Sequence, residues 1–279
     1  MDFVSILLLV LGVVLLAGLV GWLGFIIPPR KFPADLGENN TALEETAIPR
    51  DLPLPVRNYF EQYFSGAYPV PRTVVAHGHG RFRVRRLPLF GWIWAPLAWQ
   101  LYLAPGQAFV WRMRLYWFHR LVVDGGESYI QGHGRYLAGR TLTESEGLDR
   151  SERTLLWLYT LIFAPGAMLA HPGAAWQPIG DHTARLLLTF PDEILEFTLY
   201  FDDETSGLKR IETIRCGSRG EVLYPYQICL RDEIDLGGDN KLPSHFATAW
   251  EGDIYARYQT DAIAMNGPIA EAIKSGIEG

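Results

Sequence analysis

Two closely spaced histidines are the residues of this chain that most readily suggest chemistry. His77 and His79 lie two positions apart in TVVAHGHGRFRVRR, a segment that alternates polar and apolar residues. Side chains at i and i+2 project from one face of a strand, and histidines placed in this way can bind a metal such as zinc. A third ligand would come from elsewhere, and the candidates are His119, Asp124, His133 and His245. The neighbouring arginines disfavour a cation, so we favour a solvated sheet face over the metal site of a metal-assisted hydrolase.

The arginines beside these histidines form a second candidate site. Arg81, Arg83 and Arg85 continue the same face, and Arg112 and Arg114 take alternate positions in a later segment. Guanidinium groups on neighbouring strands can hold a carboxylate or an anionic headgroup through paired hydrogen bonds. The competing interpretation, which we favour, is a solvated face on which the arginines pair with acids across the strands.

Aromatic side chains make up 13% of the chain, with nine tryptophans. Many of them fall in two alternating segments, WAPLAWQLYLAPG and QAFVWRMRLYWF. A cluster of this kind either lines a cavity for an apolar ligand or fills an ordinary core. Together with three arginines, the predicted ligand-binding residues are Trp94, Trp99, Phe109, Trp111, Met113, Arg81, Arg83 and Arg112.

Motifs for covalent or cofactor chemistry are absent from the sequence. It contains no Gly-x-Ser-x-Gly, no phosphate-binding Gly-x-x-x-x-Gly-Lys, no dinucleotide fingerprint and no Cys-x-x-Cys. The carboxylates of Asp202, Asp203 and Glu204 lie in FDDETSG, where a hairpin turn requires such residues. We therefore predict no catalytic residue and no cofactor, and we favour a non-catalytic protein. The net charge of −6 argues against nucleic acid as a partner.

The N-terminal run from Phe3 to Pro29 contains no charged side chain. As a helix, residues 3–27 exceed the roughly 20 residues that cross a bilayer, and no basic n-region or small-residue cleavage site marks a signal peptide. We predict a single-pass transmembrane helix at 3–27, followed by a flexible linker at 28–50 that is rich in proline and acids. The side of the membrane on which the β domain lies stays undecided, because Arg30 and Lys31 favour the cytoplasmic side only weakly.

The rest of the chain alternates with period two, as β-strands do. We expect a hairpin with its turn at Ala104 to Gln107, and a further strand pair that turns at Asp124 to Gly126. A short amphipathic helix is expected at Leu52 to Phe64, and one stronger helix at about 148–168 interrupts ten or eleven strands. Twisted sheets of this length curl or close. The sequence therefore predicts, over 51–265, a long curved antiparallel sheet or incomplete β-barrel with the helix packed on its concave side, and a frayed tail at 266–279. Whether Cys216 and Cys229 pair is left open.

A resemblance rests on several signatures in a fixed order. These are WAPLAWQ, AFVWRMR, YIQGHGRYL, AAWQPIGDHTARLLL, FDDETSGL and AWEGDIYARY. From Leu52 to Ile263 the chain resembles an uncharacterised bacterial family of unknown function whose members are often membrane-anchored. The expected fold is also similar to the half-barrel of lipoprotein-localisation proteins and mycobacterial lipoprotein carriers, which hold acyl chains.

Three functions follow from these observations. The first is a membrane-anchored module that binds a lipid-like or other apolar ligand inside the half-barrel. The second is a structural or protein-interaction domain with a filled core. The third, least favoured, is the metal-assisted hydrolase based on His77 and His79.

Overall fold

The computed structural model describes residues 2–30, 32, 43–64, 67–87, 91–217, 222–235 and 241–278, with the backbone alone described at 85–87 and 278. Thirteen strands of these residues form one antiparallel sheet in the order β8-β7-β6-β5-β4-β3-β15-β14-β13-β12-β11-β10-β9. The strands of this sheet are β3 (Val74–Leu87), β4 (Gly91–Ala104), β5 (Ala108–Trp117), β6 (Arg120–Ile130), β7 (His133–Ala138), β8 (Thr141–Glu144), β9 (Ala174–Gly180), β10 (Thr183–Thr189), β11 (Ile194–Phe201), β12 (Leu208–Cys216), β13 (Leu223–Asp235), β14 (Lys241–Trp250) and β15 (Asp253–Met265).

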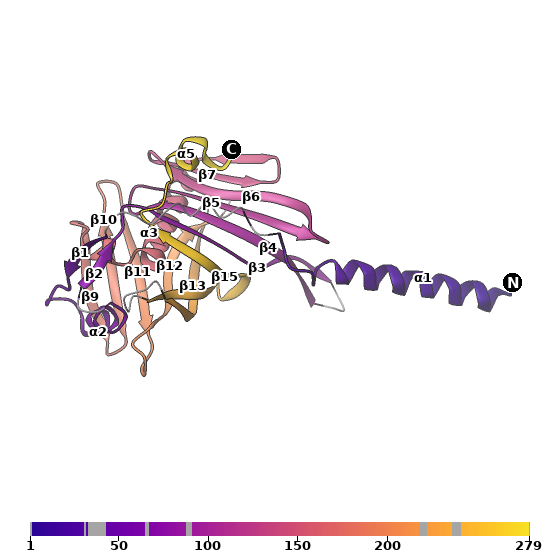
Figure 1. Ribbon diagram of the computed structural model, residues 1–279, viewed down its shortest axis with the longest axis horizontal. Helices are drawn as coiled ribbons and strands as arrows, with labels where there is room; N and C mark the ends of the chain where they lie inside the picture. Colours follow the sequence, from indigo (N-terminus) through magenta and orange to yellow (C-terminus); the bar gives the residue numbers. More distant parts are fainter. Residues whose placement is uncertain are drawn as a thin grey trace.

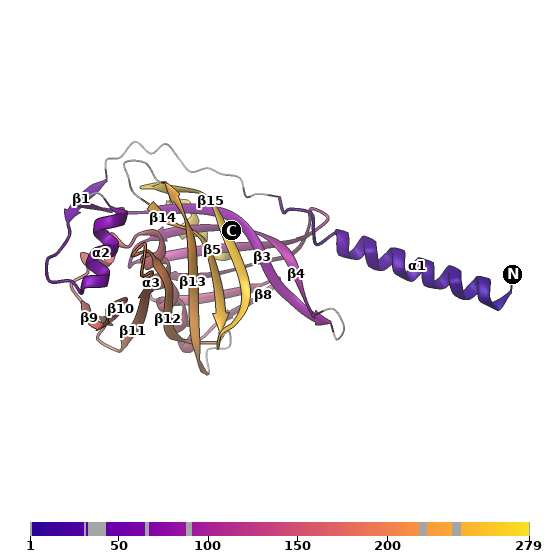
Figure 2. The same cartoon turned by 90° about the horizontal axis from the view of Figure 1, so that it is seen from below.

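The chain path explains this strand order. From β3 it meanders outward to the edge strand β8, passes through helix α3 (Glu146–Phe163), resumes at the opposite edge with β9 and returns to β15, which pairs with β3. The sheet curves around α3 (Figures 1 and 2). The predicted mainly β architecture, a curved open antiparallel sheet with one helix packed on its concave side, is confirmed.

Helix α3 occupies the concave side because its sequence gives it a capped start and a wide apolar surface. The Ser145 hydroxyl accepts a hydrogen bond from the Leu148 N–H (3.2 Å), which satisfies one of the free amides at the helix start. The Tyr159 ring stacks on Trp111 with centroids 5.0 Å apart, and Phe163 lies 6.2 Å from Trp99. The helix ends at Phe163, earlier than predicted, and a short helix α4 (Gly166–Leu169) starts after Pro165.

Smaller elements close one end of the sheet. Helix α2 (Leu54–Tyr63) buries the aromatic stripe expected from its spacing, including Tyr59 and Phe60. Strands β1 (Glu44–Ala47) and β2 (Ala67–Val70) form a separate two-stranded sheet. Part of the predicted flexible linker is therefore a strand, and its pairing with β2 could not be seen in the linker's own composition.

Helix α1 (Phe3–Leu23) projects away from the β domain (Figure 2) and buries none of its side chains within it. The helix has 21 residues, and an 18-residue stretch of it has a mean hydropathy of 3.1, so by length and composition it is able to cross a membrane. The base of the helix is held by the turn between β5 and β6. The Trp117 indole N–H donates to the Gly21 carbonyl (3.0 Å), and the Phe118 N–H donates to the Gly24 carbonyl (3.1 Å).

One local expectation was wrong. The turn predicted at Asp124 to Gly126 lies inside β6, and the chain instead turns at Gln131 and Gly132, which both have positive φ. The C-terminal tail contains two short helices, α5 (Ala270–Ser275) and a 3-10 helix, η1 (Gly276–Glu278). Its Ile277 is buried, because Gly126 has no side chain: a Cβ there would lie 3.3 Å from Ile277 Cγ2 and 2.3 Å from the Trp111 carbonyl oxygen. Both cysteines are free.

Candidate functional site

The predicted ligand-binding residues divide between the two faces of the sheet. Trp99, Phe109, Trp111 and Met113 share the concave face, where Trp99 stacks on Trp111 with centroids 4.7 Å apart. Phe109 and Trp99 are fully buried in the core. The concave face thus keeps half of the predicted set together, although only Trp111 and Met113 line an open pocket.

The other half of the set lies on the outer face. Arg83 pairs there with Asp253 and lies over the Trp92 ring at 3.9 Å. Arg112 donates to the Gly276 carbonyl (2.7 Å) and so fastens the C-terminal tail. Of the two remaining residues, Arg81 lines a separate outer hollow that is described below, and the ring of Trp94 packs against Arg257 of the same hollow. The side chain of Arg85 lies outside the described residues.

The two histidines also face outward from β3. His77 is buried opposite Gln100, and His79 Nδ1 lies 2.8 Å from a carboxylate oxygen of Asp261. Within the described residues, no group of three or more His, Cys, Asp or Glu side chains is placed to hold a metal ion. The geometry therefore gives no support to the metal-assisted hydrolase.

The concave side of the sheet contains a pocket of about 480 Å³ between strands β5–β7 and β12–β15. Its walls are mostly aromatic and aliphatic, and its polar groups gather at the first half of α3. The residues that line it are Phe82, Trp111, Met113, Leu115, Val123, Gly125, Gly126, Glu127, Tyr136, Leu137, Ala138, Glu152, Arg215, Gly217, Tyr224, Trp250, Glu251, Tyr255 and Tyr258. This volume falls within the roughly 300–1,000 Å³ typical of small-molecule sites.

A buried charged cluster forms the polar end of the pocket. Arg215, near the end of β12, donates through Nη2 to Glu152 of α3 (2.9 Å) and to Glu127 of β6 (3.0 Å). Its Nε donates to the Ser151 hydroxyl (2.8 Å), which in turn donates to the Cys216 carbonyl (3.0 Å). Three segments far apart in the sequence are thereby joined beside the pocket.

The balance of charge in this cluster is unusual. The side chain of Glu152 has 0% exposure and that of Arg215 only 4%, so both are almost entirely removed from water. Burial raises the pKa of Glu152 well above its usual range; the negative charge of Glu127 adds to this, while Arg215 opposes it. Glu152 Oε2 has no hydrogen-bond partner in the described part of the chain. A buried oxygen of this kind is costly unless it is satisfied.

The arginine stays charged in this environment. Burial acts to lower the pKa of Arg215, but the two carboxylates outweigh it and hold the pKa well above its usual range. The guanidinium also lies over the rings of Tyr226 (5.3 Å) and Trp250 (5.5 Å). The pocket therefore ends on a fixed cation whose neighbours are two carboxyl groups and two aromatic faces.

Tyrosines add neutral polar groups to the walls. Burial raises the pKa of Tyr136, Tyr255 and Tyr258, so their phenols stay protonated at neutral pH. The hydroxyls of Tyr226 and Tyr255 lie 3.2 Å apart. A bound molecule would thus meet apolar ring faces along the walls and hydrogen-bonding groups toward the charged cluster.

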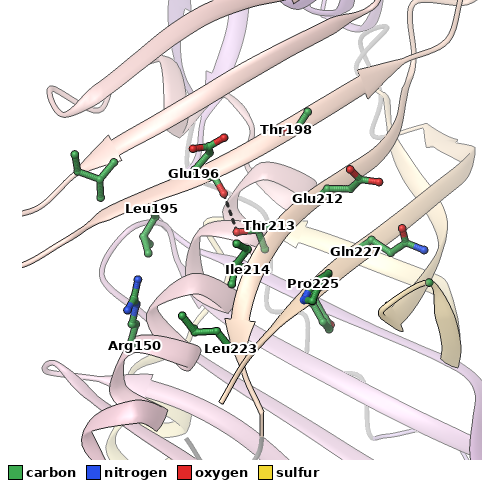
Figure 3. Close-up of a pocket in the computed structure, with 13 residues that line it drawn as sticks. Arg150, Leu195, Glu196, Thr198, Glu212, Thr213, Ile214, Leu223, Pro225 and Gln227 are labelled. Atoms are coloured by element: carbon green, nitrogen blue, oxygen red, sulfur yellow. Dashed lines mark hydrogen bonds between the residues drawn. The ribbon is translucent and has the colours of Figure 1, made fainter. Parts of the chain in front are cut away.

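Another hollow, of about 560 Å³, lies along β11–β13 beside Arg150 of α3 (Figure 3). Its charged groups already have partners. Arg150 pairs with Glu193 (2.7 Å), Glu196 with Arg185 (2.9 Å) and Glu212 with Arg210 (3.0 Å). Since these groups are satisfied by the protein itself, the concave pocket is the stronger candidate site.

Sequence reasoning missed the charged cluster. Two signals were present. Glu152 lies on the apolar stripe of its helix, four residues after Leu148 and three before Leu155. Arg215 continues the inward alternation that begins at Ile211 and Thr213. A charged residue on a buried stripe indicates a partner on a facing element. Nothing in the local sequence, however, shows that Glu127 would meet them.

A match to a protein family confirms the expected resemblance. A family model described as "Family of unknown function (DUF6544)" matches residues 42–258. No curated protein matches the chain. Among solved structures, the chain is similar to a Vibrio parahaemolyticus domain described as part of an outer membrane lipoprotein-sorting protein, with 6% identity, a TM-score of 0.37, and coverage of 73% of this chain and 89% of that one.

Proposed function

Because this chain belongs to the DUF6544 family, whose function is unknown, we propose a function from its own site: the protein binds a lipid-like or other apolar molecule in the concave pocket, without chemically changing it. The observation that carries this proposal is the pocket of about 480 Å³, which has mostly aromatic and aliphatic walls and a buried charged cluster at one end. Most of a ligand's surface would be covered there by side chains that are already in place.

The polar end defines how such a ligand would be oriented. Its apolar part would contact Trp111, Met113 and Leu115, and its polar group would lie toward Glu152 and Arg215. A hydroxyl or amide fits this end, because it can both donate to a carboxylate oxygen and accept from a phenol or guanidinium. A long anionic chain without a donor fits less well, since it would meet two carboxyl groups.

The same proposal assigns α1 to the membrane. Its apolar surface is unburied within the described residues, and its base is fixed to the β5–β6 turn through Trp117 and Phe118. The pocket would then lie in a domain held close to the bilayer, where apolar molecules are concentrated. The chain after the helix also packs on the sheet, where Phe32 contacts Ala98 and Tyr116.

Ligand binding is tested with a pocket-filling substitution and a matched control. Val123 faces the pocket, whereas its neighbour Val122 is 60% exposed on the other side of β6. Residues 43–279, which retain β1, are purified without detergent and titrated with the neutral fluorescent amine N-phenyl-1-naphthylamine, an apolar molecule with one N–H donor. Native mass spectrometry of the same sample detects any molecule that copurifies.

We expect one probe per chain for the wild type and for Val122→Trp, and a loss of binding of at least tenfold for Val123→Trp. Equal binding by both variants would place the probe outside the pocket and contradict the proposal. If the wild-type domain is empty and takes up no probe, a structural or protein-interaction role replaces binding as the better explanation.

A further inference from the structure

A third hollow, of about 580 Å³, lies on the outer face of the sheet, directly after the apolar helix. One side of it is formed by Ile26, Pro28 and Pro29, and the other by outward residues of β3, β13, β14 and β15. Two arginines of this hollow, Arg81 and Arg257, are direct partners across the β3 and β15 pair. Like charges placed opposite each other in this way destabilise a sheet.

Neither arginine is compensated by an acid among the described residues. The other charged groups of the hollow do have partners. His79 bonds Asp261 (2.8 Å), and Asp232 lies 3.3 Å from His245 and 4.0 Å from Arg231. On the edge of the hollow, Asp253 is engaged by Arg83. Arg81 and Arg257 therefore leave the hollow positively charged.

Packing holds one of these guanidiniums in place. Arg257 lies over the Trp94 ring at 5.0 Å from its centroid, and Trp94 projects from the same outer face of β4. Both arginines are exposed, so their charged ends remain open to a partner from solvent. A fixed guanidinium beside a second one matches a phosphate group, which accepts several charge-assisted hydrogen bonds at once.

We propose that Arg81 and Arg257 bind a phosphate group in this hollow, and that its source is the headgroup of an anionic membrane lipid. The position favours a lipid because the hollow begins at Ile26, three residues after the last residue of α1, Leu23. Ile26, Pro28 and Pro29 supply an apolar wall beside the two charges, as a lipid's glycerol region would require. This site is separate from the concave pocket, and only its lipid source rests on the proposed placement of α1 in the membrane.

The test uses the full chain in dodecyl maltoside micelles and three probes, added in separate titrations followed by calorimetry. The probes are dihexanoyl phosphatidylglycerol, dihexanoyl phosphatidylcholine and inorganic phosphate. Arg81→Gln and Arg257→Gln are the test variants. Arg185→Gln is the matched control, because Arg185 is a partly exposed arginine on a distant strand, β10, where it pairs with Glu196. Thermal unfolding of each variant confirms that it is folded.

We expect phosphatidylglycerol to bind once per chain and more tightly than phosphatidylcholine. Each test variant should weaken this binding by about tenfold, the effect of one charge-assisted contact at an exposed site, and the control should leave it unchanged. If inorganic phosphate binds equally tightly and with the same dependence on both arginines, the phosphate site stands and its source is a soluble anion. The proposal is overturned if no probe binds, or if binding survives in both test variants.

Discussion

Replacing Arg215 with methionine tests whether the buried cluster is held together by charge. The substitution keeps a long apolar side chain but removes the hydrogen bonds to Ser151, Glu127 and Glu152. Two carboxyl groups are then left next to each other without a counter-charge. Removing one partner of a buried ion pair typically costs about 3–5 kcal/mol. For a domain of this size, that corresponds to a fall in Tm of roughly 6–20 °C.

The loss of unfolding free energy in Arg215→Met should grow as the pH rises. The pKa of Glu152 is already raised by burial, and removing Arg215 raises it further because the attraction that opposed burial is gone. A carboxyl whose folded pKa is raised contributes stability that is complete below its ordinary value of 4.5, and this stability is lost as the pH rises through the folded pKa. The loss of unfolding free energy caused by Arg215→Met should therefore be larger at pH 8 than at pH 5.

Urea unfolding followed by tryptophan fluorescence at both pH values measures this loss. Arg185→Met is the control, because its ion pair with Glu196 is partly exposed and should be worth at most about 1 kcal/mol. Two results would refute the account of the cluster given above. One is a loss of unfolding free energy no larger than that of Arg185→Met, and the other is a loss that is the same at pH 5 and pH 8.

Three further predictions follow from single contacts. Glu152→Gln should flatten the dependence of unfolding free energy on pH above about 4.5, because the carboxyl with the raised pKa is gone; denaturant titrations across pH 5 to 8 check this. Gly126→Ala should lower the unfolding free energy by about 1–3 kcal/mol, since its Cβ would lie 2.3 Å from the Trp111 carbonyl oxygen, and thermal unfolding measures the loss. Trp117→Phe should loosen the base of the apolar helix by removing the bond to Gly21, at a cost of about 1 kcal/mol, and should speed proteolysis after Arg30 while leaving the domain intact.

The curvature of the sheet could be predicted, but the exact strand pattern could not. Alternation identified the long strands β3, β4 and β5, and the hairpin between Ala104 and Gln107 was confirmed. The turn assigned to Asp124 to Gly126 failed because glycine has two uses. It allows a turn, but it also allows close approach of a backbone or side chain within a strand, as Gly126 does beneath Ile277.

The sequence by itself determined the apolar helix, the mainly β domain and the single helix packed against it, because each depends on a local period of hydrophobic residues. It also determined which aromatic residues are available, but not which of them share a face with the arginines. That was decided by register: Trp99 and Trp111 pack inward against α3, while Arg81 meets Arg257 on the opposite face. The cluster of Arg215, Glu127 and Glu152 likewise exists only after folding, because its members come from β12, β6 and α3 and no local pattern brings them together.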